Sequence, residues 1–240
     1  MQIVIPGFSR SPYGLIVLLS VAVGFSVSAF RMRRSGVGKQ NILYTCLLTL
    51  ICTLITSLLV EFRITAEGVR MGFSGLGAAV GMIAGVFLAS LIIKDKPDMV
   101  MASFVTSAPL MYALAKTGCL FAGCCHGKPY TGIFAIVYTG GDHEGSYFPV
   151  QLIDMAVFLV LHLFAVILIS KIKNKVRAIY IILAIFIAVR YLLEYLKYYH
   201  DGSLIASGQI TVLFAGAAAL ILITVWQRVL KKSINGTVSP

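Results

Sequence analysis

Two oppositely charged residues interrupt one of the most apolar stretches of the 240-residue chain. Arg190 and Glu194 lie in AIYIILAIFIAVRYLLEYLKYY, residues 178–199, and their spacing of four residues places them on one face of a helix. A charge inside a membrane span is costly, and a buried ion pair rarely stabilises a protein more than apolar packing does. We therefore expect a functional pair, with Arg190 roughly 14 Å from the end of the helix and close to mid-membrane.

A second group of reactive residues lies in KTGCLFAGCCHGK, residues 116–128, which contains Lys116, Cys119, Cys124, Cys125 and His126. The C-x4-C-C-H spacing lacks the paired ligands of common zinc sites, so no metal ion is expected. A Cys119–Cys124 disulfide, a covalent thiol relay and simple packing of small apolar side chains remain open, and we favour packing or the disulfide. His126 is a titratable ring and a candidate acid–base residue.

Other polar residues stand at the ends of apolar runs that should meet at the same level. These residues are Tyr13, Lys116, Gln151, Asp154 and Gln209. Together with Arg190 and Glu194 they predict a polar cavity at one end of a helix bundle, containing the two cations Lys116 and Arg190. Arginine forms bidentate contacts with phosphate and lysine acts as a point charge, so the cavity suits an anionic lipid headgroup.

The elements that position these residues are predicted from composition. The chain is 59% hydrophobic and 12% charged, which is typical of an integral membrane protein rather than a soluble domain. Seven apolar runs have the length of membrane spans. They cover residues 12–30, 41–61, 73–93, 98–115, 148–169, 178–199 and 208–227. We therefore predict an all-α integral membrane protein that forms a single polytopic domain over residues 1–240. The glycine-rich stretch GFSGLGAAVG in the third run predicts close helix packing.

Basic residues predict the orientation, because cytoplasmic loops are enriched in Lys and Arg. Thirteen of the twenty Lys and Arg follow the first, third, fifth and seventh runs. The N-terminus is therefore expected outside and the C-terminus in the cytoplasm. The formal net charge of +11 then reflects topology, and no nucleic-acid partner is expected. A long extracytoplasmic loop, residues 117–147, should follow the fourth helix, with a strand pair around residues 133–138.

The motifs, taken in order, resemble the prolipoprotein diacylglyceryl transferase family over almost the whole chain. The resemblance rests on SPYGL, the glycine-rich third run, KTGCLFAGCCHGKP, FPVQLID, RYLLEYLK and SGQI. It implies a multi-pass enzyme of the bacterial plasma membrane, without a cofactor, that moves a diacylglyceryl group from phosphatidylglycerol to the cysteine thiol of a lipoprotein precursor. Substrate-binding positions implied by the matching motifs are Tyr13, Gly118, Gly123, Gly127, Gln151 and Gln209.

The same resemblance suggests catalytic roles. Lys116 stands where well-studied members carry an arginine, and Lys116 and Arg190 would hold the phosphodiester while Glu194 orients Arg190. Leu76 stands where those members carry a histidine, so His126 or Glu194 would accept the thiol proton. Cys119 and Cys124 also depart from the family pattern. Two alternatives remain: a paralogue with a different acceptor, or a non-enzymatic transporter or lipid-binding membrane protein.

Overall fold

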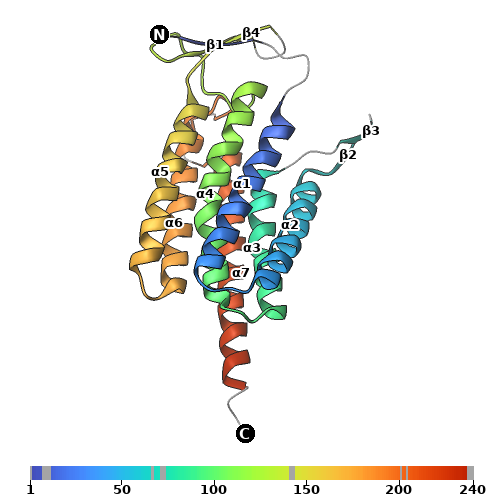
Figure 1. Cartoon of the computed structure of the whole chain (residues 1–240). Helices are drawn as coiled ribbons and strands as arrows, with labels where there is room; N and C mark the ends of the chain where they lie inside the picture. Colours follow the sequence, from blue (N-terminus) through green and yellow to red (C-terminus); the bar gives the residue numbers. More distant parts are fainter. Residues whose placement is uncertain are drawn as a thin grey trace.

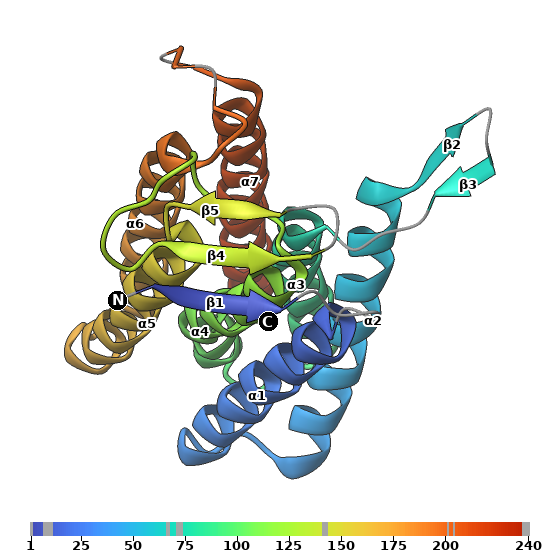
Figure 2. The same ribbon diagram turned by 90° about the horizontal axis from the view of Figure 1, so that it is seen from above.

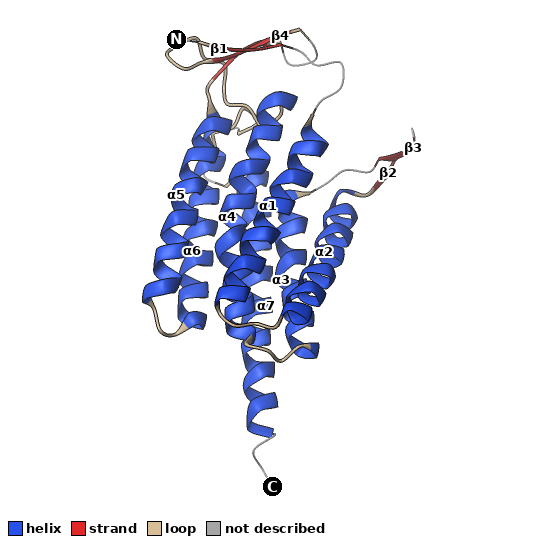
Figure 3. Cartoon of the chain, in the orientation of Figure 1, coloured by secondary structure: helices blue, strands red, loops and turns tan. Residues whose placement is uncertain are grey.

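The computed structural model describes residues 2–6, 12–65, 68–70, 74–140, 144–200, 202–203 and 205–236. In this part of the chain, seven helices are long and apolar enough to cross a membrane, which confirms the predicted all-α membrane architecture (Figure 3). They are α1 (Tyr13–Arg34), α2 (Lys39–Glu61), α3 (Gly75–Ile92), α4 (Pro97–Ala122), α5 (Val150–Lys171), α6 (Lys175–Leu193) and α7 (Ser207–Gly236).

Two helix ends differ from the prediction, and both differences matter for the site. Helix α4 continues to Ala122, where Gly123 takes a left-handed conformation (φ 70°), so Lys116 lies inside the helix rather than at its end. Helix α6 ends at Leu193 and passes into the 3₁₀ turn η1 (Glu194–Leu196) instead of continuing to residue 199. Arg190 therefore lies in the last turn of α6, so its expected place deep within a longer helix was wrong.

A small sheet covers one end of the bundle. Strand β4 (Ile136–Thr139) pairs antiparallel with β5 (Gly145–Tyr147) and parallel with β1 (Ile3–Pro6), and all three lie across the helix ends (Figure 2). The strand pair expected near residues 133–138 is thus present, slightly displaced toward the C-terminus. Its buried face packs Ile5, Leu120, Ile136 and Tyr138 together, which attaches the sheet to the end of α4. A separate hairpin joins β2 (Arg63–Thr65) to β3 (Gly68–Arg70).

Glycines allow α2 and α3 to pack closely. A Cβ atom on Gly85 would lie 2.7 Å from the Cα of Thr49, and one on Gly77 would lie 2.7 Å from the carbonyl oxygen of Thr56. Larger residues would therefore push the helices apart, as the small-residue pattern predicts. Helix α7 is attached to α3 by the buried Trp226, whose indole nitrogen donates to the Ser90 hydroxyl over 2.7 Å.

The outer surface of the bundle is apolar. Exposed large hydrophobic side chains occur on several helices, including Leu18 (62%), Leu59 (67%), Val160 (65%) and Phe214 (74%). Such a surface suits lipid better than water. The connections α1–α2, α3–α4 and α5–α6 lie at the end opposite the sheet (Figure 1), and together with the helix turns beside them they carry ten of the twenty Lys and Arg.

Candidate functional site

Five charged side chains form a buried network where the ends of α4, α5 and α6 meet beneath the sheet. The Lys116 ammonium lies 3.0 Å from Oδ2 of Asp154, and the Lys197 ammonium lies 3.9 Å from the same oxygen. Lys197 is also 3.7 Å from Oε2 of Glu194, which forms an ion pair with Arg190. The charges therefore alternate from Lys116 through Asp154, Lys197 and Glu194 to Arg190.

This network carries one excess positive charge. It contains three cations and two carboxylates, and each of the five residues is at most 9% exposed. Removing charges from water costs several kcal/mol per ion, and attraction within a balanced set only offsets that cost. An excess cation is therefore unfavourable unless an anion binds. Among the described residues, the network is prepared for a ligand with one negative charge.

Tyr112 connects the two cations that the sequence singled out. It lies one helical turn before Lys116 on α4, and its ring centroid is 5.0 Å from the Lys116 ammonium and 5.7 Å from the guanidinium carbon of Arg190. Both distances are within the range of cation–π attraction. Lys116 and Arg190 therefore belong to one site, although they come from different helices.

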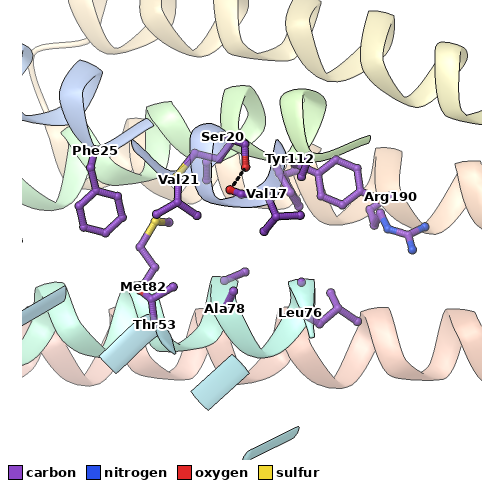
Figure 4. A pocket seen from close by; sticks show the side chains of 16 residues that line it. Val17, Ser20, Val21, Phe25, Thr53, Leu76, Ala78, Met82, Tyr112 and Arg190 are labelled. Atoms are coloured by element: carbon purple, nitrogen blue, oxygen red, sulfur yellow. Dashed lines mark hydrogen bonds between the residues drawn. The ribbon is translucent and has the colours of Figure 1, made fainter. Parts of the chain in front are cut away.

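A largely apolar cavity of about 740 Å³, which includes space open to the outside, leads away from this network (Figure 4). Val17 and Val21 of α1 face Leu76, Ala78 and Met82 of α3 across it. Arg190 and Tyr112 lie at one end of the cavity, and Phe25 lies at the other (Figure 4). A cavity with a cationic end and a long apolar body matches a phospholipid, which has a charged headgroup and acyl chains.

One hydrogen-bond donor of Arg190 is unpaired in the part of the chain that the structure describes. Its Nε–H is buried and has no hydrogen-bond partner among the described residues, although the neighbouring NH1 group pairs with Glu194. A buried unsatisfied donor costs about 1–3 kcal/mol, and more when it is charged. Because Arg190 also lines the cavity, this free donor suits an oxygen atom of a ligand bound there.

Glu194 is held on several sides. Its carboxylate pairs with Arg190 and accepts a hydrogen bond from the Tyr199 hydroxyl, which lies beyond η1. Gly208, near the start of α7, approaches the carboxylate so closely that a Cβ atom there would clash with it. Glu194 is therefore well placed to orient Arg190, as the resemblance implies.

The pKa of Lys197 is lowered by its surroundings. Burial, together with the nearby positive charges of Lys116 and Arg190, lowers its pKa to about 8. The carboxylates of Glu194 and Asp154 oppose this shift. Lys197 therefore approaches neutrality within one to two pH units above physiological pH, unlike an exposed lysine.

Of the expected substrate-binding residues, Tyr13 and Gly118 lie beside each other. Tyr13 begins α1, and a Cβ atom on Gly118 would lie 3.2 Å from its ring. Gln151 and Gln209 instead make contacts within the protein. Gln151 donates to the Cys124 carbonyl over 2.9 Å and to the Tyr138 hydroxyl over 3.1 Å. Gln209 accepts from the backbone N–H of Ala206 and pairs with a ring nitrogen of His200 over 2.9 Å.

His126 and Gly127 join three segments above the network. The His126 ring lies 4.0 Å from the Tyr147 ring and 4.3 Å from the Tyr198 ring, between centroids, and Nδ1 is 2.9 Å from the Gly127 carbonyl. A Cβ atom on Gly127 would lie 2.7 Å from the Phe148 carbonyl oxygen. These contacts give both residues a structural role, and proton transfer by His126 stays a prediction.

The cysteines of the motif converge. All five cysteines of the chain are free, so the Cys119–Cys124 disulfide is not formed. The sulfur atoms of Cys119, Cys124 and Cys125 nevertheless lie within 4.8 Å of one another. The turn at Gly123 folds the two later cysteines back onto the last turn of α4, which the linear spacing did not predict.

The sequence placed Asp154 in the predicted polar cavity but gave it no catalytic or binding role, and Lys197 was not among the expected site residues. A signal for Lys197 was present, because Arg190, Glu194 and Lys197 follow one another at i, i+4 and i+7 and so share a helical face. Asp154 follows Gln151 by three residues at the start of α5. No spacing in the sequence indicates that α5 brings the carboxylate of Asp154 between two lysines.

Comparison with known proteins supports the same conclusion. The chain is 22% identical over 234 residues to "Phosphatidylglycerol--prolipoprotein diacylglyceryl transferase 2" of Clostridium perfringens (strain 13 / Type A), covering 90% of this chain and 91% of that protein. The family model described as prolipoprotein diacylglyceryl transferase matches residues 1–226. This chain therefore belongs to the prolipoprotein diacylglyceryl transferase family.

Proposed function

We infer that this chain transfers the diacylglyceryl group of phosphatidylglycerol to the cysteine thiol of a lipoprotein precursor and releases glycerol phosphate. Family membership and the name of the Clostridium relative support this activity. The observation that carries the structural argument is the excess positive charge, with a free Arg190 donor, at one end of an apolar cavity. Phosphatidylglycerol matches this arrangement, because its phosphodiester carries a single negative charge beside two acyl chains.

We propose that the donor lipid binds with its phosphate at Arg190 and Lys116 and its chains along the cavity wall formed by α1 and α3. Lys197 completes the positive surroundings, while Asp154 holds both lysines and Glu194 holds Arg190. Because these groups are positioned before substrate arrives, they stabilise charge without reorganising during the reaction. Lys116 contributes a point charge rather than the bidentate contact of an arginine.

In the proposed reaction the acceptor sulfur attacks the carbon of the diacylglyceryl group that is bonded to the phosphate oxygen. A carbon–sulfur bond forms, the carbon–oxygen bond breaks, and the electron pair leaves with glycerol phosphate. The thiolate is the effective nucleophile, so the thiol must lose its proton. Glu194 is already paired with Arg190 and bonded to Tyr199, which supports an orienting role for it more than proton transfer.

We further propose that the sheet-bearing end of the bundle faces outward in a bacterial plasma membrane. The basic residues in and beside the connections at the opposite end agree with a cytoplasmic location by the positive-inside rule. The N-terminus and the segment between α4 and α5 would then be extracytoplasmic, and the C-terminus cytoplasmic. The site would open at the level of the outer leaflet, where a translocated precursor arrives.

The test measures glycerol phosphate release by the purified chain in phosphatidylglycerol vesicles with a lipobox peptide. Arg190→Ala and Lys116→Ala should each lower the rate about 10²–10³-fold, the usual effect of removing one electrostatic stabiliser. Arg228→Ala is the matched control, because Arg228 is exposed near the far end of α7. Full activity of either site variant would refute the assignment.

The acceptor is tested with a second peptide in which serine replaces the lipobox cysteine. We expect no release with serine, and rescue of a strain depleted of its own transferase by the unmodified chain. Transfer to another acceptor at an equal or higher rate would instead identify a paralogue. Lipid binding without any release would favour the non-enzymatic alternative.

A further inference from the structure

The proposed chemistry does not use the three converging cysteines, yet their geometry is that of a ligand set. Cys119 lies in the last turn of α4, and Cys124 and Cys125 follow Gly123 in the turn behind it. Zinc–sulfur bonds of about 2.3 Å in a tetrahedral site place the sulfurs about 3.8 Å apart. The sulfur atoms here already lie within 4.8 Å of one another, so binding an ion requires a closure of only about 1 Å.

The set is rigidly supported. Gln151, fully buried on α5, donates to the carbonyl of Cys124, and the Tyr138 hydroxyl of β4 donates to the carbonyl of Leu120. Cys125 has a positive φ of 57°, which is uncommon for a residue other than glycine. Hydrogen bonds to the segments that carry metal ligands hold those ligands in position.

One coordination position remains open. Within the described residues, no histidine, aspartate or glutamate joins the three thiols as a fourth ligand. Structural zinc sites have four protein ligands, whereas catalytic sites have three and leave the fourth position to water or substrate. A three-cysteine set next to a reaction centre therefore matches the catalytic kind.

The surrounding charges also match. One Zn²⁺ with three thiolates carries one net negative charge, and a fourth thiolate raises this to two. The cations Lys116 and Lys197 both interact electrostatically with Cys125. They therefore attract the thiolates of the loaded site, while the unpaired Nε–H of Arg190 remains available to the donor phosphate.

We propose that Cys119, Cys124 and Cys125 bind a Zn²⁺ ion whose open position takes the cysteine thiol of the acceptor as a thiolate. This inference rests on the proposed transferase function. On binding, the acceptor thiol releases its proton to solvent; its sulfur then forms the bond to the glycerol carbon as the carbon–oxygen bond breaks. Metal coordination deprotonates a thiol outright. It would replace a general base, because the described residues that line the cavity include no histidine or carboxylate.

Metal binding is tested on the full-length protein in detergent. Zinc content should be about one per chain by mass spectrometry, and Cys119→Ser, Cys124→Ser and Cys125→Ser should each lower it. Cys46→Ser, on α2, is the matched control and should keep the metal. Circular dichroism of each variant verifies folding. Absence of bound zinc from the unmodified protein after incubation with Zn²⁺, or equal zinc in all variants, would overturn the proposal.

The open position is tested with Co²⁺ in place of zinc. Three thiolates should give sulfur-to-cobalt charge-transfer absorption, and the lipobox peptide should change the cobalt d–d bands, whereas the serine peptide should not. Bands that ignore the cysteine peptide would refute the acceptor role. Metal removal should lower transfer at least tenfold, with recovery on adding Zn²⁺. Full transfer by zinc-free protein would reject the metal role and leave the proposed transferase function intact. A cobalt site that responds to the peptide, without any transfer, would support the metal site and reject the transferase function.

Discussion

Asp154→Asn tests whether the buried network is held together by the one carboxylate that lies between two lysines. At an effective dielectric constant of about 20, a charge pair at 3.0 Å attracts by about 5.5 kcal/mol and one at 3.9 Å by about 4.3 kcal/mol. Part of this attraction is offset because the neutral side chain no longer has to be desolvated as an ion. Breaking a buried pair typically costs about 3–5 kcal/mol, and we expect that loss in the free energy of unfolding.

The measurement is equilibrium unfolding in mixed micelles, followed by circular dichroism. The double variant Lys116→Met/Asp154→Asn restores the original excess of one positive charge and removes the strongest unpaired cation. It should therefore be more stable than Asp154→Asn by about 2 kcal/mol. Asp98→Asn is the control, because Asp98 is exposed in the first turn of α4, and it should change stability by less than about 1 kcal/mol.

Two results would refute this reasoning. The free energy of unfolding of Asp154→Asn could lie within about 1 kcal/mol of that of the unmodified protein, which would mean that burial of the lysines does not depend on the carboxylate. Alternatively, the effects of the two single substitutions could simply add in the double variant, which would mean that Lys116 and Asp154 are not energetically coupled.

Two further predictions concern stability. In the same unfolding assay, Gly127→Ala should lower the free energy of unfolding by about 1–3 kcal/mol, because its Cβ atom would lie 2.7 Å from a backbone oxygen. The control is Gly14→Ala, which should be neutral or slightly stabilising because a Cβ atom there has nothing within 4 Å. Burial and two cations lower the folded-state pKa of Lys197 from 10.5 to about 8. Between these pH values the unfolded chain binds more protons than the folded chain, so the free energy of unfolding should rise with pH in that window. Lys197→Met should lose this rise in the difference between melting temperatures at about pH 8 and about pH 10; an equal rise in both proteins would contradict the low pKa.

Much of this protein is determined by local sequence. Long apolar runs have no stable alternative to helices that face lipid, so the seven helices follow from hydropathy alone. The pairing of Arg190 with Glu194 also follows, because residues four apart on a helix are neighbours. The family could be identified for a related reason: its motifs keep their order along the chain.

Only the tertiary structure decided which distant groups meet. Asp154 joins Lys116 to Lys197 because α4, α5 and α6 end together, and no local periodicity encodes that meeting. Lys197 lies beyond the early end of α6 at Leu193 and is buried against Asp154 of α5, a partner that no spacing along α6 encodes. Likewise, the left-handed turn at Gly123 brings Cys119, Cys124 and Cys125 together despite an unpromising spacing. These contacts depend on where helices end and turn, because moving a helix end by a few residues changes the direction in which the side chains beyond it point.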